Sequence, residues 1–413
     1  MTLQTEDIIA SIGRYMQPLE KGGFEVESFS HRGDALISAL AERLKRPHDI
    51  ALHEFRNCIS KAVHSTLRAE SIDLNHFETE LRTEFNRIRT RKGQSYIAWS
   101  KLSYITNKNF KIKMPDGEFE IRSQLPKCLR NFEDPARKYY GHFEEPKGSF
   151  ILCSGYFRSQ LSAGYSLTKL LEQAIAWLNF PLNIGSGYSY PLHGRAKFKM
   201  GPVILIYNQD RTVYEEIFWQ NDEYNPFLYS GIFAGHDDFE YSRNYLRAMS
   251  RKRRINSLLT TVTTCLIILN RSWLSGDPKE SMALAWTAFE RLFSQPYDRT
   301  SQEIITRRAV KFDADPVGLQ TVLESLQKVR NSVYHSLPNH SDMNVLYSVY
   351  EDGLRFLLWK LNWCVQNGSK FESKEEYLSF TDYPKDEPAI EKEKRLMDLQ
   401  RSYWSASWPS AKK

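Results

Sequence analysis

The sequence has few cysteines and no motif typical of a metal site. Its 413 residues include five cysteines that lie far apart and lack a CxxC spacing, namely Cys58, Cys128, Cys153, Cys265 and Cys364. This distribution favours buried, reduced thiols over a disulfide framework. The 10 histidines are scattered as well, without an HExxH motif or a cysteine–histidine cluster, which argues against a zinc site. We therefore expect chemistry without a metal ion or another cofactor.

Long apolar runs are also absent. The longest candidate, SLLTTVTTCLIIL at residues 257–269, is too short and too rich in threonine to span a bilayer, which takes about 20 apolar residues. The N-terminus does not combine a basic stretch with an apolar one, as a secretory leader would. We therefore expect a cytoplasmic protein without a membrane partner.

Neither sign of charge dominates, because 56 Lys and Arg stand against 50 Asp and Glu, a net charge of +6. This excess is too small to indicate nucleic-acid binding by itself. One segment differs: YSRNYLRAMSRKRRIN at 241–256 contains no acid and has basic residues at Arg243, Arg247, Arg251, Lys252, Arg253 and Arg254. Cations at the start of a helix oppose its dipole and attract an anionic partner. A solvated helix face would give the same pattern.

The spacing of apolar residues divides the chain into four regions. Residues 1–95 have helical spacing, as in DALISALAERL at 34–44, and form a predicted helical N-terminal region. Residues 96–244 contain short runs rich in Tyr, Phe, Ile and Val, which favour a β-rich α+β domain. Residues 245–368 return to helical spacing with short connections, as in an antiparallel helical bundle, and 369–413 form a C-terminal arm. We predict an α+β multidomain fold, since the length suits two or three domains.

The sequence also predicts individual elements. FKIKMPDGEFEI at 110–121 is a strong hairpin signal, because Pro115 presets one turn angle and Gly117 accepts a positive one. A second hairpin is predicted over 202–219. Helices are expected over 166–178, 252–274, 278–293, 301–312, 316–335 and 343–366, with a short one around 389–403.

An arginine, an asparagine and a histidine lie within six positions in KVRNSVYHSLPNHSD at 328–342. On a helix Asn331 and His335 share a face, whereas Arg330 and His335 diverge by about 140°. The guanidinium meets the imidazole only if Arg330 reaches round or the last turn unwinds ahead of Pro338, which disfavours helix at the residue before it. The polar cap of an ordinary helix end would contain the same residue types.

These three side chains suit the cleavage of a phosphodiester without a metal ion. Arg330 supplies a planar, permanently charged donor for phosphate. His335 titrates near neutral pH and can move protons, and Asn331 can orient the imidazole or a phosphate oxygen. RNA carries its own nucleophile in the 2′-hydroxyl, so transphosphorylation would leave a 2′,3′-cyclic phosphate and a 5′-hydroxyl end.

The pattern Arg330-Asn331-x-x-x-His335 is an R-x4-H motif between the last two helices of a predicted four-helix unit. In this setting it resembles the motif of the HEPN superfamily of ribonucleases. ALAWTAFERLF at 283–293 is similar to the second helix of the ApeA-like HEPN branch, which contributes an acidic residue that Glu290 matches. The resemblance covers about 245–368 and implies that Glu290 helps to position Arg330 or His335.

The resemblance also implies partners and a biological role. HEPN proteins commonly form dimers in which two R-x4-H motifs make one RNA-cleaving cleft, so we expect a homodimer or a higher homo-oligomer. A two-fold axis would supply the second histidine, which a step needing both a base and an acid requires. The family implies a toxin-like effector of anti-phage defence by abortive infection, acting on tRNA or other cellular RNA, with 96–244 as a sensor or regulatory domain for a phage-derived trigger. Candidate RNA-binding residues are Arg251, Lys252, Arg253, Arg254, Arg307 and Arg308.

Two alternatives stay open. The bundle would be a noncatalytic dimerisation or nucleotide-binding module if Arg330, Asn331 and His335 only cap a helix end. An enzyme centred on 96–240 has less support, because no nucleophile there is paired with a base. Cleavage of RNA in the presence of EDTA separates the nuclease from both.

Overall fold

The structure is a computed structural model of the chain. It describes all residues apart from 1–4, 14–15, 19–23, 27–31, 69–73, 115–116, 128, 130–147, 186–195, 209–217, 221–233, 251–255, 276, 296–299, 311–314, 334–342, 383–387, 389, 393, 396 and 399–413.

The chain folds into two compact units, each built from several segments. Unit 1 consists of Met1–Trp99, Leu152–Lys169 and Ile204–Trp219. Unit 2 consists of Ser100–Ile151, Leu170–Val203 and Gln220–Lys413. Both α-helices and β-strands are present, as the sequence predicts. The boundaries proposed at 95, 244 and 368 remain predictions.

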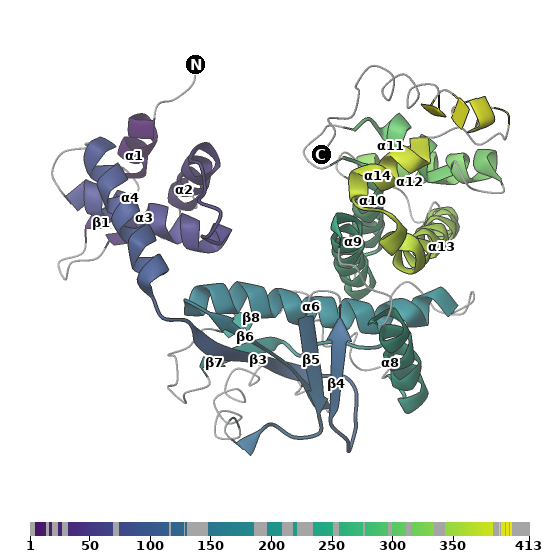
Figure 1. Ribbon diagram of the computed structural model, residues 1–413, viewed down its shortest axis with the longest axis horizontal. Helices are drawn as coiled ribbons and strands as arrows, with labels where there is room; N and C mark the ends of the chain where they lie inside the picture. Colours follow the sequence, from purple (N-terminus) through teal and green to yellow (C-terminus); the bar gives the residue numbers. More distant parts are fainter. Residues whose placement is uncertain are drawn as a thin grey trace, which may run out of the picture. The chain divides into compact units, whose positions relative to one another are not determined.

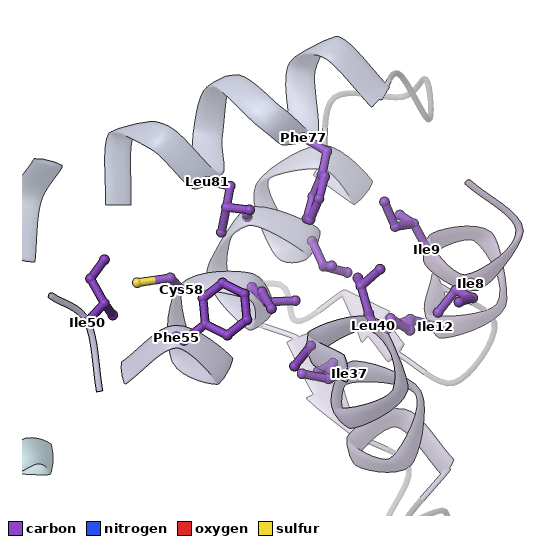
Figure 2. Packing of buried hydrophobic residues seen from close by; sticks show 14 of the residues in the cluster. Ile8, Ile9, Ile12, Ile37, Leu40, Ile50, Phe55, Cys58, Phe77 and Leu81 are labelled. Carbon is purple, nitrogen blue, oxygen red and sulfur yellow. The ribbon is translucent and has the colours of Figure 1, made fainter. Parts of the chain in front are cut away.

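Four helices form the start of unit 1, namely α1 (Thr5–Gly13), α2 (Arg32–Arg43), α3 (Leu52–Arg68) and α4 (Leu74–Thr90). A small antiparallel pair, β1 (Met16–Pro18) and β2 (Phe24–Val26), lies between α1 and α2 in the chain. Figure 2 shows how Leu40, Phe55 and Phe77 from three of the helices meet in one apolar cluster. Burying each such large side chain contributes about 1.5–3 kcal/mol, so this cluster accounts for the helical N-terminal region.

Six strands form one sheet in the order β4-β5-β6-β3-β7-β8 (Figure 1). The strands are β3 (Gln94–Leu102), β4 (Phe110–Met114), β5 (Gly117–Arg122), β6 (Ser149–Phe157), β7 (Val203–Asn208) and β8 (Phe218–Gln220). β4 and β5 pair antiparallel with Met114 opposite Gly117, which confirms the hairpin predicted around Pro115. β7 and β8 are neighbours in the sheet, as the second predicted hairpin requires, and their connection lies outside the described residues.

One long helix, α6 (Gln160–Gly185), packs on the sheet and exceeds the predicted 166–178 at both ends. A side chain at Gly117 of β5 would meet Leu170, and one at Gly155 of β6 would meet Leu167, so glycine permits the close approach. Asn179 of α6 forms two hydrogen bonds with the backbone of Phe198, at 2.8 and 2.9 Å. These contacts hold α6 beyond the predicted range.

Unit 2 ends in the helical bundle. Its helices are α8 (His236–Ser250), α9 (Ser257–Leu274), α10 (Pro278–Phe293), α11 (Gln302–Val310), α12 (Pro316–Val333), α13 (Met343–Asn367) and α14 (Lys374–Asp382), with a 3-10 turn η5 (Gly368–Lys370) before α14. α10 contacts both α9 and α12, and α12 contacts α13 (Figure 1). α13 also contacts α9, and α11 lies between α10 and α12 in the chain. The HEPN-like four-helix unit stays a prediction.

Polar contacts fix the register of the bundle helices. The Ser272 hydroxyl of α9 donates to the Ser281 carbonyl of α10 at 2.8 Å, and the Ser281 hydroxyl donates back to the Ser272 carbonyl at 2.7 Å. The Ser272 hydroxyl also lies 2.9 Å from the Tyr350 hydroxyl of α13. Since these groups are buried, losing any partner would leave an unsatisfied polar atom in the core.

Helix starts follow capping residues. α10 begins at Pro278, as predicted, because the Asp277 carboxylate accepts a hydrogen bond from the Lys279 amide at 2.9 Å. α9 begins at Ser257 instead of near 252, because Asn256 is its N-cap and accepts from the Leu259 amide at 2.9 Å. The Asn256 amide group also donates to the carbonyls of Gly368 and Phe371. The sequence predicted that this helix starts near 252, within the basic segment. That prediction was wrong, because the helix starts after Asn256.

The four described cysteines are buried, free thiols: Cys58, Cys153, Cys265 and Cys364. This confirms the prediction for these four, while Cys128 lies outside the described residues. Burial raises the pKa of Cys58 to about 11 and that of Cys265 and Cys364 to about 12, and it raises the pKa of Cys153 as well.

We expect these thiols to react slowly with a thiol reagent in the folded chain. A pH of 8 is below the pKa of each of the four thiols, so they stay protonated. Burial also keeps the reagent away from them. Titration with a chromogenic disulfide reagent should detect at most Cys128 before denaturation and all five cysteines afterwards. Rapid reaction of two or more thiols in the folded chain would contradict this burial.

Candidate functional site

The acidic residue matched by the resemblance, Glu290, is held by two neighbours. Its Oε1 accepts a hydrogen bond from Trp286 Nε1, one helical turn earlier on α10, at 2.9 Å. It also accepts from Gln302 Nε2 at the start of α11, at 2.6 Å. Trp286 is fully buried, so its indole fixes the carboxylate from the core side. Hydrogen bonds to a charged group are worth about 1.5–3 kcal/mol each.

Arg330 of the R-x4-H motif lies beside this carboxylate. Arg330 Nη1 is 3.6 Å from Glu290 Oε1, and the two side chains are 32% and 22% exposed. The pair joins α10 to the last turn of α12, 40 residues further along the chain. At this partial exposure the ion pair stabilises the fold by about 1 kcal/mol at most. Its main effect is to restrict the direction of the guanidinium while leaving it open to solvent.

The other two motif residues differ in how far the structure describes them. Asn331 is exposed on α12 and follows Arg330 directly. His335 lies within 334–342, outside the described residues, so the distance from Arg330 to the imidazole stays a prediction. α12 is described to Val333, two residues before His335.

A polar groove of about 620 Å³ runs between α11 and α12. Gln302 and Arg307 line it from α11, and Lys328 and Asn331 line it from α12. The remaining lining residues are Glu303, Thr306, Val310, Gln320, Glu324 and Gln327. We call this the α11–α12 groove. Its lining residue Gln302 also contacts Glu290, which connects the groove to the Glu290–Arg330 pair.

The adjacent arginines of α11 have different environments. Arg307 has a side chain that is 66% exposed, with one contact of 3.8 Å to Asp382. Arg308 has a side chain that is 8% exposed; its Nε and Nη2 donate to the Asp382 carboxylate, and its Nη1 donates to the Phe293 carbonyl at 2.9 Å. Arg307 is thus placed to meet an anion in the groove, whereas the guanidinium of Arg308 is bound within the fold. We therefore do not expect Arg308 to contact RNA.

The other basic candidates, Arg251, Lys252, Arg253 and Arg254, lie outside the described residues between α8 and α9. Their binding to RNA stays a prediction. Arg243, on α8, contacts Glu240 and lies over the ring of Phe110, with its guanidinium carbon 5.2 Å from the ring centroid. It therefore contributes to packing within unit 2.

Replacing Arg308 by methionine should destabilise the chain far more than the same change at Arg307. The first change removes the hydrogen bonds that Arg308 donates to the Phe293 carbonyl and the Asp382 carboxylate, at a cost of about 2 kcal/mol in the free energy of unfolding. The second removes one exposed ion pair, worth less than about 1 kcal/mol. Thermal unfolding followed by circular dichroism measures both. Equal shifts would show that the contacts of Arg308 do not stabilise the fold.

Trp286 and Gln302 are site residues that the sequence analysis missed. For Trp286 a signal exists, since residues four apart on a helix share a face and Trp286 stands four before Glu290. For Gln302 the sequence offers none, because its contact depends on how α11 returns to α10. Its Oε1 is buried and has no hydrogen-bond partner among the described residues.

Comparison of the chain with protein-family models, curated proteins and solved structures finds no match. Within the described part of the chain, no three His, Cys, Asp or Glu side chains gather closely enough to hold a metal ion. Among the same residues, no helix is both long and apolar enough to cross a membrane.

Proposed function

We propose that the chain is an endoribonuclease of the HEPN type, which cleaves RNA by transphosphorylation without a metal ion. The observation that supports this most is the Glu290–Arg330 pair at 3.6 Å. The resemblance implies a role for Glu290 next to the motif, and its contact with Arg330 supports that role.

In this proposal Arg330 binds the phosphate to be cleaved. The contact with Glu290 is made through Nη1, so the opposite edge of the guanidinium, Nε and Nη2, can donate hydrogen bonds to two phosphate oxygens. Paired donors of this geometry match phosphate better than the single ammonium of lysine does. Glu290, Trp286 and Gln302 act on the reaction by holding the guanidinium in this direction.

His335 moves the protons and Asn331 orients the reacting groups. The neutral imidazole takes the proton of the 2′-hydroxyl, the 2′-oxygen attacks phosphorus, and the bond from phosphorus to the 5′-oxygen breaks. The leaving 5′-oxygen takes a proton from a second imidazolium, which His335 of the partner subunit supplies in a two-fold dimer. The products are a 2′,3′-cyclic phosphate and a 5′-hydroxyl end.

The α11–α12 groove gives the strand a path away from the cut. Arg307 and Lys328 can contact phosphates along it, and the amides of Gln320 and Gln327 can bind sugar hydroxyls or base edges. Glu303 and Glu324 balance the two cations, so the groove is not a strong electrostatic trap. We infer moderate affinity and a substrate that is single-stranded at the cut, such as a tRNA loop.

A simple experiment tests the proposal. The purified chain, incubated with total tRNA in EDTA, should release fragments that end in a 2′,3′-cyclic phosphate. Expression of the chain in growing cells should arrest growth, as expected of a toxin-like effector in abortive infection. The proposal would be refuted if micromolar protein, as a dimer or as a monomer, left tRNA and other cellular RNA uncut. That result would favour the noncatalytic module.

A further inference from the structure

A small aromatic cavity is lined by Arg308, the neighbour of Arg307 in the α11–α12 groove. Its volume is about 180 Å³, and Phe293, Arg308, Trp359, Lys360, Trp363, Tyr377, Phe380 and Thr381 line it. Pockets for drug-sized ligands measure about 300–1,000 Å³, so this cavity has room for one ring system. All of its lining residues belong to unit 2.

The aromatic lining offers flat faces in a rigid frame. The rings of Trp363 and Phe380 are stacked, with centroids 6.1 Å apart and planes at 6°. Trp359 stands at the rim with 50% of its surface exposed. A large aromatic side chain at the mouth of a cavity is a platform on which a flat ring can stack, and every nucleobase has such a face.

The charge at the cavity favours an anion beside that ring. Lys360 and Arg308 both line it, and no carboxylate does. Lys360 Nζ lies 4.8 Å from the ring centroid of Trp359 and 5.0 Å from that of Phe356. Asp382 neutralises one charge of the neighbouring arginines, Arg307 and Arg308. Burial raises the pKa of Tyr377 well above its usual range, so its hydroxyl is uncharged.

We propose that this cavity is a nucleotide subsite, in which a nucleobase stacks on Trp359 and its phosphate meets Lys360 in the lining. The chemistry fits a nucleotide of an RNA strand and a free mononucleotide alike. For an RNA strand the proposal rests on the proposed function: Asp382 joins Arg308 of the cavity to Arg307 of the α11–α12 groove, so a strand leaving the groove can place one unpaired base in the cavity.

Binding measurements test the subsite without depending on cleavage. The probe is a short single-stranded RNA with a fluorescent label, bound to the full chain carrying His335→Ala and followed by anisotropy. Trp359→Ala should weaken binding by about 5- to 150-fold, the range expected for the loss of one stacked base. Trp359→Phe should retain most of the affinity because it keeps a ring face. Tyr156→Ala removes an aromatic side chain that is 70% exposed on β6 and should leave binding unchanged.

Adenosine monophosphate and inorganic phosphate, used as competitors, separate the two sources of the ligand. Displacement of the RNA by adenosine monophosphate but not by phosphate supports a subsite that also accepts a free nucleotide. Loss of RNA binding in Trp359→Ala without such displacement supports a subsite for the strand alone. Equal binding by Trp359→Ala and its parent overturns the subsite, and cleavage by the unmutated chain would then leave the proposed function standing. If the chain cuts no RNA but binds adenosine monophosphate in a way that depends on Trp359, the subsite would be supported and the proposed function refuted.

Discussion

Replacing Arg330 or His335 by alanine should each lower the rate of RNA cleavage in EDTA by at least about 100-fold, while the chain stays folded. Loss of a general acid or base costs about 10²- to 10⁴-fold. Loss of a group that stabilises developing charge costs about 10²- to 10³-fold. Arg330 is partly exposed and makes one ion pair with Glu290, so its removal should barely change the thermal unfolding midpoint.

Matched variants separate chemistry from charge. Arg355→Ala removes the same charge from α13, where the guanidinium makes a 3.7 Å ion pair with Asp352, and it should leave cleavage near the wild-type rate. His236→Ala is the matched control for His335→Ala, because it removes an exposed histidine at the start of α8. Cleavage that falls equally in Arg330→Ala and Arg355→Ala would mean that only overall charge matters, and the assignment of Arg330 would fail.

Replacing Glu290 by alanine should reduce the turnover of RNA by up to about 100-fold without weakening RNA binding. The change releases the guanidinium of Arg330, and a misplacement of about 1 Å in a catalytic group can cost about 100-fold. It also removes a negative charge from the site, so affinity for RNA should stay the same or rise. The variant should be less stable by about 1–3 kcal/mol, because the buried indole of Trp286 loses its acceptor.

Glu290→Gln is the control that keeps the fold. Its amide oxygen can still accept from Trp286, so the thermal unfolding midpoint should stay close to that of the wild type, whereas Arg330 loses its charged partner and turnover should fall. Single-turnover rates and anisotropy titrations with the same labelled RNA measure turnover and affinity separately. Unchanged turnover in both Glu290 variants would show that the carboxylate serves only the packing of α10.

The helices of the bundle were predictable where the signal is local. α10 begins at Pro278 because Asp277 caps it, and both residues are visible in the sequence. The β4–β5 hairpin follows in the same way from Pro115 and Asp116 between two alternating runs, but the positive φ predicted at Gly117 was wrong, because Gly117 is the first residue of β5 and pairs with Met114. α14 was missed and its residues assigned to the arm, since a nine-residue helix with few apolar positions has a weak pattern. Its place depends on distant contacts, such as Lys374 Nζ donating to the Arg291 carbonyl at 2.8 Å.

The site could be assembled from the sequence only in part. Glu290 and Arg330 were assigned together through a resemblance, because no spacing rule relates residues on different helices. Arg307 and Arg308 were predicted to act alike, yet one is exposed and the other is buried against Asp382. Neighbours on a helix point about 100° apart, and which of them faces the core depends on where α14 packs. The sequence does not contain that information in a local pattern.

The measurement that tests the account most directly is the chemistry of the RNA ends. Wild-type protein and His335→Ala are incubated in EDTA with an RNA labelled at its 5′ end, and with the same RNA carrying 2′-deoxy sugars at the sites of cleavage. We expect the wild type to produce 2′,3′-cyclic phosphate ends from the first RNA and no cut at the deoxy positions, and we expect His335→Ala to produce neither. Fragments with 5′-phosphate ends, cleavage at the deoxy positions, or equal cleavage by His335→Ala would contradict an imidazole and a guanidinium that act on one phosphodiester.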